Sequence, residues 1–147
     1  MKTRIASRLL ILALAVSSVL ATHASACDDQ SIRGTYAFTI HGKILLPDGS
    51  SLLVEGVAKT TFDGRGNIKQ FDAVGVNGNV LPGWRLSKGV YKVNADCTGS
   101  FVVTNDPQPP IHAQMLIARS GNSIHAVVID PGFATTSDAE RIRNPKD

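Results

Sequence analysis

Apolar and polar residues alternate in short runs along most of the chain. In residues 34–40, Tyr36, Phe38 and Ile40 fall on one face of an extended segment, and threonine and alanine fall on the other. A period of two, rich in β-branched and aromatic residues, is typical of half-buried strands. The pattern predicts strands at residues 34–40, 52–62, 67–76, 89–93, 100–105, 111–119, 123–130 and 133–142.

Turn-forming residues separate these runs. Glycine and asparagine, which tolerate positive φ, stand at residues 47–49, 63–66, 77–79, 120–122 and 130–132. Residues 105–110 are expected to be irregular, because their three prolines cannot donate hydrogen bonds within a central strand.

About eight strands joined by sequential hairpins predict an all-β, antiparallel up-and-down barrel, with a β-sandwich as the alternative. An eight-stranded barrel has room for its own side chains or for one small ligand. Small residues within the runs, such as Gly56, Ala73 and Ala126, would leave space in that interior.

The first 26 residues have the parts of a secretory signal peptide. Basic residues precede the apolar run at residues 9–20, and Ala24-Ser25-Ala26 supplies small residues for cleavage. The run is shorter than the roughly 20 residues that span a bilayer. We therefore predict export to the periplasm or the exterior, a single domain at residues 27–147, and no transmembrane segment.

The charge balance argues against nucleic-acid binding. The chain has 15 basic and 12 acidic residues. Lys2, Arg4 and Arg8 lie in the predicted signal peptide, so the remainder has equal numbers of both signs. Binding to nucleic acid needs clustered basic residues that neutralise phosphates, and no such run remains.

The two cysteines, Cys27 and Cys97, predict a disulfide, because an even number of cysteines in an exported chain favours pairing. The stretch "ASAC" before Cys27 also loosely resembles a lipobox, which gives lipid anchoring through Cys27 as the alternative. The acidic neighbourhood of Cys97 argues against a reactive thiol there.

The stretches "GTYAFTIHG", "GVAKTTFDGRGNI" and "GVYKVNADCTGSF" resemble small exported bacterial proteins. These proteins are placed with the allene-oxide-cyclase-like barrel group, which is related in shape to dirigent proteins and lipocalins. The resemblance covers most of the chain after the signal peptide and consists of strand and turn signatures. It implies a calycin-like barrel, and its members include both cyclases and proteins of unassigned function. No catalytic residue is transferred from them.

Glu55 is the candidate catalytic residue. A carboxylate inside an apolar barrel would have a raised pKa and could act as a general acid or base. The alternative is that its face of the strand, shared with Leu53, Val57 and Lys59, is exposed to solvent. Asp72 is a weaker candidate of the same kind.

Candidate ligand-binding residues are the aromatic and polar side chains of the predicted strands and of one loop. They are Tyr36, Phe38, Trp84, Tyr91, His112, Gln114 and His125. The histidines show no metal-ligand spacing, so neither a metal site nor another cofactor is predicted.

Two functions are compatible with these features. The first is an exported barrel that binds a small hydrophobic molecule in its lumen, as a carrier or as an isomerase or cyclase. The second is a non-catalytic periplasmic or secreted protein whose barrel is filled by its own side chains and which acts through its surface. Both functions stay open at this point, as does the oligomeric state.

Overall fold

The computed structural model describes residues 26–80, 82–105 and 107–142. The predicted signal peptide, apart from Ala26, lies outside the described residues. The elements are two short 3-10 helices and nine strands. The helices are η1 (Asp29–Ile32) and η2 (Arg119–Gly121), and the strands are β1 (Gly34–Leu45), β2 (Ser51–Phe62), β3 (Asn67–Val76), β4 (Asn79–Val80), β5 (Arg85–Val93), β6 (Thr98–Asn105), β7 (Gln108–Ala118), β8 (Ser123–Val128) and β9 (Phe133–Arg141). No helix among the described residues is long and apolar enough to cross a membrane.

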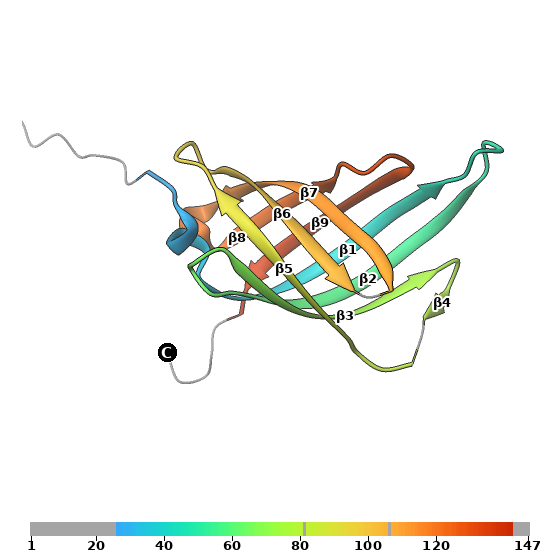
Figure 1. Ribbon diagram of the computed structural model, residues 1–147, viewed down its shortest axis with the longest axis horizontal. Coiled ribbons are helices and arrows are strands. Elements are labelled where there is room, and N and C mark those ends of the chain that lie inside the picture. The colour runs from blue at the N-terminus through green and yellow to red at the C-terminus, as the bar shows by residue number, and fades with distance from the viewer. Residues whose placement is uncertain (1–25, 81, 106, 143–147) are drawn as a thin grey trace, which may run out of the picture.

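Eight strands close into an antiparallel barrel (Figure 1). Neighbours in the barrel are neighbours in sequence, except that β5 pairs with β3 because β4 forms only a short side hairpin on β3. Pairing of β1 with both β2 and β9 closes the ring. The structure confirms the predicted all-β class and selects the barrel over the sandwich.

The eight predicted strands are all present, and the differences lie at their ends. β5 begins at Arg85, four residues before the predicted start, and β7 begins at Gln108 within the segment expected to be irregular. The prolines are tolerated because β7 pairs only with β6 at this end, and a register shift follows between Val103 and Asn105. Pro109 and Pro110 are therefore not in a central ladder.

One end of the barrel is closed by a packed core. Tyr36, Phe62 and Ile124 are almost completely buried there, and Ile32 of η1 is buried with them. The Phe62 ring meets the rings of Tyr36 and Tyr91 edge to face, at centroid distances of 5.5 and 4.9 Å. Burial of this many aromatic rings is a large apolar contribution to stability.

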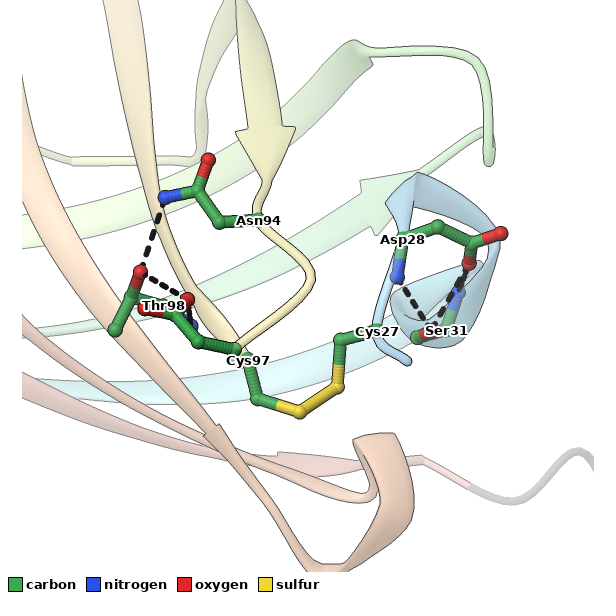
Figure 2. The surroundings of a disulfide bond; sticks show 7 residues. Cys27, Asp28, Ser31, Asn94, Cys97 and Thr98 are labelled. Carbon is green, nitrogen blue, oxygen red and sulfur yellow. Dashed lines mark hydrogen bonds between the residues drawn. A yellow bond between two sulfur atoms is a disulfide. The ribbon is translucent and has the colours of Figure 1, made fainter. Parts of the chain in front are cut away.

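The N-terminal segment covers this closed end and is held by the disulfide. Cys27 and Cys97 are bonded, with their Cα atoms 5.0 Å apart, which confirms the predicted pair (Figure 2). In this bond Cys27 has no thiol left for lipid attachment, so the structure does not support the lipid-anchor alternative. The first residue after the predicted signal peptide is thereby attached to the β5–β6 turn.

Asp29 provides a second attachment for the same segment. Its carboxylate accepts hydrogen bonds from the backbone N–H of Val93 at 2.8 Å and from Lys92 Nζ at 3.1 Å. Its carbonyl oxygen accepts a hydrogen bond from the Tyr91 hydroxyl at 2.9 Å. The disulfide and these bonds together fix η1 over the end of the barrel.

The predicted turn at residues 63–66 is organised by one carboxylate. Asp63 Oδ1 accepts hydrogen bonds from the backbone N–H groups of Arg65 and Asn67, and Oδ2 accepts one from the Asn67 side chain at 2.6 Å. These donors, the Asn67 side chain above all, lower the pKa of Asp63. The stretch is a structural hairpin turn.

Candidate ligand-binding site in the barrel lumen

The half of the barrel away from η1 contains a cavity of about 290 Å³. This volume is close to the lower end of the range for small-molecule sites, roughly 300–1,000 Å³. Gln108 and Pro109 line the cavity and are also exposed, so it reaches the surface at the strand ends opposite the disulfide. We call this end the mouth.

Most of the cavity wall is apolar. Phe38, Phe62 and Phe101 lie toward the closed end, with the Phe38 ring 6.5 and 6.4 Å from the other two. Aliphatic side chains continue the wall toward the mouth. Among them are Ile40, Ile44, Val54, Val74, Val76 and Val103. Such a lining suits an apolar ligand, since its burial removes apolar surface from water.

A polar cluster occupies one side of this wall. The strand register explains it, because Asp72 of β3 lies opposite Arg85 of β5, while Gln70 lies opposite both Ser87 and Thr60. Side chains of one strand that are two residues apart point to the same face. Three adjacent strands therefore direct their polar side chains into the lumen at one level. We call these five residues the polar cluster.

Asp72 is the centre of the polar cluster and is 3% exposed. Arg85 Nε donates to its Oδ1 at 2.7 Å, and Arg85 Nη2 lies 2.6 Å from the same oxygen. Its Oδ2 accepts hydrogen bonds from Ser87 Oγ at 3.2 Å and from Gln70 Nε2 at 3.1 Å. Thr60 Oγ1 donates to Gln70 Oε1 at 2.9 Å and completes the chain. This pairing is what a buried carboxylate requires.

Glu55 does not lie in the lumen. The lumenal face of β2 carries Val54, Ala58 and Thr60, whereas Glu55 is exposed on the outer face. The expectation of Glu55 inside an apolar barrel is therefore wrong, because β2 is in the opposite phase. Asp72, named from the sequence as a weaker candidate, is the carboxylate that the lumen contains.

Three of the aromatic candidates point inward, but only Phe38 lines the cavity. Tyr36 and Tyr91 are buried at the closed end, where both hydroxyls bind backbone groups. Burial raises the pKa of Tyr36 to about 12, although the positive charge of Arg141 acts to lower it. Burial also raises the pKa of Tyr91. These two tyrosines are structural, so they are not supported as ligand contacts.

Trp84 lies outside the barrel. It is 61% exposed, and it flanks a shallow surface depression with Phe71 and Lys59. It directly precedes Arg85, the first residue of β5, and neighbouring residues of an extended chain point to opposite faces, so Trp84 points away from the lumen. The structure therefore does not support Trp84 as part of a lumenal site.

The remaining candidates are also on the outer face. Gln114 is exposed, and His112 and His125 retain 45% and 54% side-chain exposure. Each histidine ring is paired with an aspartate, His112 with Asp130 at 2.8 Å and His125 with Asp138 at 2.6 Å. Within the described residues, no group of three or more metal-binding side chains comes together.

Sequence reasoning named only Asp72 of the polar cluster and missed the other four residues, among them Arg85 and Ser87. Both share the phase of Tyr91 and Val93, so extending the predicted strand toward its N-terminus would have placed them in the lumen. The contact of Arg85 with Asp72 could not be predicted from the sequence. It depends on the pairing of β3 with β5, which are separated in the chain by the short strand β4.

Comparison with known proteins does not add to this site. No family model, curated protein or solved structure matches the chain. The lumen is therefore the feature of the molecule that bears on function.

Proposed function

We propose that the protein is an exported binding protein that holds one small, mainly hydrophobic molecule in its lumen. The observation that carries the proposal is the cavity of about 290 Å³, which is apolar on most of its wall and has a hydrogen-bonded polar cluster on one side. Concave apolar sites with a few placed polar groups are typical of small-molecule binding.

The alternative of a filled barrel is less well supported. Tyr36 and Met115 do fill the closed end, but Phe71, a residue that could have plugged the lumen, is on the outer face. Export is supported by the signal-like leader and by the disulfide, which persists in oxidising compartments. The isomerase or cyclase activity implied by the resemblance stays a prediction.

The proposal is tested with the neutral fluorescent probe N-phenylnaphthylamine. Its fluorescence should rise on mixing with the purified, oxidised protein, and Val74→Trp should weaken binding at least about tenfold by filling the lumen. Val57→Trp is the matched control, because Val57 is 48% exposed on the outer face. It should leave the affinity unchanged.

Equal binding to both variants, or none to the unaltered protein, contradicts the proposal. Cooperative thermal unfolding confirms that each variant is folded. If Val74→Trp does not fold, Val76→Phe provides a smaller obstruction nearer the mouth.

A further inference from the structure

The lumen contains one positive and one negative side chain. Asp72 and Arg85 are the charged residues among those that line the cavity, and they are in direct contact. The formal charge of the cavity wall is therefore zero. A ligand that enters is not met by an uncompensated charge.

The carboxylate of this pair is already saturated. Both Asp72 oxygens accept hydrogen bonds from protein donors, which are Arg85, Ser87 and Gln70. Asp72 is also almost completely buried. A ligand that donates a hydrogen bond to Asp72 would have to displace one of these donors.

The guanidinium still has donors to offer. Its Nε and Nη2 contact Asp72, whereas Nη1 has no hydrogen-bond acceptor within the described residues. The Arg85 side chain is 36% exposed and lines the cavity. Every fully buried polar side-chain atom in the described residues has a partner, so Nη1 is accessible. The polar cluster thus has a free guanidinium N–H, whereas its one carboxylate is saturated.

From this asymmetry we infer that the lumen selects uncharged apolar molecules with one hydrogen-bond acceptor, such as a ketone, ester or ether oxygen, and that Arg85 Nη1 donates to it. The inference rests on the proposed function and narrows its ligand class. An anion would add a negative charge beside a pair that is already neutral, and a cation would meet Arg85 with no open carboxylate. Burying an unpaired charge is unfavourable, whereas a neutral oxygen satisfies the donor at no such cost.

The apolar wall fixes the orientation of such a ligand. Val74 and Val76 follow Asp72 along the same face of β3 toward the mouth, and Val54 lies opposite Val76 on β2. The oxygen would lie at the polar cluster, beside the aromatic end of the cavity. The hydrocarbon part would extend along the valines.

The test compares nonanone, nonane and nonanoate as competitors of N-phenylnaphthylamine. These probes share a carbon chain and differ in the acceptor and the charge. Nonanone should bind at least about tenfold more tightly than either of the others, because a hydrogen bond to a charged donor is worth about that factor. The infrared stretch of an isotope-labelled carbonyl should also shift to lower frequency on binding.

Two variants assign the effect to the ion pair. Asp72→Asn leaves the charge of Arg85 uncompensated, so nonanoate should become the tightest of the three probes. The double variant Asp72→Asn/Arg85→Met removes both charges, so nonanone should lose its advantage over nonane and its infrared shift. Glu55→Gln is the matched carboxylate-to-amide control on the outer face and should change none of these rankings.

The outcomes separate the inference from the proposed function. Equal affinity for nonanone and nonane, or tightest binding of nonanoate by the unaltered protein, overturns the inference. Binding of N-phenylnaphthylamine in the lumen without competition by any of the three probes overturns it as well. Failure of N-phenylnaphthylamine itself overturns the proposed function. If Asp72→Asn does not fold, the double variant Asp72→Asn/Arg85→Met and the infrared shift still test the inference.

Discussion

The guanidinium of Arg141 lies 4.9 Å from the centre of the Tyr36 ring, and both side chains donate a hydrogen bond to the carbonyl oxygen of Gly121. Arg141 also donates to the carbonyl oxygens of Ser31 and Arg33. One arginine from the last strand thus joins the N-terminal segment, η2 and the first strand at the closed end of the barrel.

Arg141→Ala is therefore expected to destabilise the fold by about 3 kcal/mol, since it leaves the partly buried carbonyl oxygens of Ser31 and Gly121 without a charged donor. Denaturant unfolding measures the change. Arg65→Ala in an exposed turn is the control and should cost less than about 0.5 kcal/mol. A loss for Arg141→Ala no larger than that of the control would show that water replaces the arginine.

Tyr36 gives the fold an alkaline limit. Its pKa is raised to about 12 in the folded protein from an ordinary value of 10.0, chiefly by burial. Its contribution is complete below pH 10.0, because the hydroxyl is then protonated in both states. Above that pH the unfolded tyrosine ionises first, so stability falls as pH rises and is lost through the folded pKa.

Tyr36→Phe isolates this contribution. The variant should be less stable at neutral pH because it loses a buried hydrogen bond, yet its stability should fall less steeply above pH 10.0. Short denaturant titrations across this range measure both slopes. Tyr91, whose pKa is also raised by burial, is present in both proteins. Parallel slopes would contradict the assignment.

The disulfide should contribute stability as a long-range crosslink. It joins residues 70 positions apart, and closing a loop of that length stabilises by up to about 4 kcal/mol in the chain-entropy model. Cys27→Ser/Cys97→Ser should therefore unfold at lower denaturant concentration and become insensitive to reductant. Hydrogen exchange at Ser31 and Val93, whose amides bond within the N-terminal attachment, should accelerate more than exchange at Tyr91. An unchanged unfolding midpoint would contradict this role.

A comparison of Gly121 with Gly78 distinguishes the cost of a steric clash from the cost of an unfavourable backbone conformation. Both have positive φ, at 84° and 78°, so alanine is conformationally unfavourable at either position. A Cβ at Gly121 would lie 2.0 Å from the carbonyl oxygen of Ser31, whereas a Cβ at Gly78 would meet nothing within 4 Å. Gly121→Ala should cost at least about 2 kcal/mol more than Gly78→Ala by thermal unfolding. Equal costs would contradict the close approach of η1 to η2.

Glu55→Gln and Asp72→Asn compare the two carboxylates named from the sequence. The first substitution lies on the outer face and should leave N-phenylnaphthylamine binding and stability unchanged. The second breaks an ion pair whose carboxylate is buried, and it should destabilise the fold by less than about 3 kcal/mol, because the Arg85 side chain is partly exposed. An effect of Glu55→Gln on probe affinity would return Glu55 to the site.

The alternation of apolar residues was sufficient to predict the barrel and its strands, and the cysteine count predicted the crosslink at Cys27. It was not sufficient to assign the lumenal face of β2, because Leu53 and Val57 make the outer face as apolar as the inner one. Likewise, the exposed aromatic Trp84 looked like a ligand contact, and the buried Tyr36 proved to be part of the packed end. Which face is inside depends on how all eight strands close together, and a single run does not contain that information.

The N-terminal segment that covers one end of the barrel has a kinetic consequence. With Ile32, Tyr36 and Ile124 filling that end, a molecule in the lumen exchanges with solvent at the mouth, where Gln108 and Pro109 lie. Entry and departure along one route pass the same barrier. Bulkier side chains that narrow the mouth without touching the bound molecule should therefore slow both association and dissociation by the same factor, so that occupancy lasts longer while the equilibrium affinity is preserved.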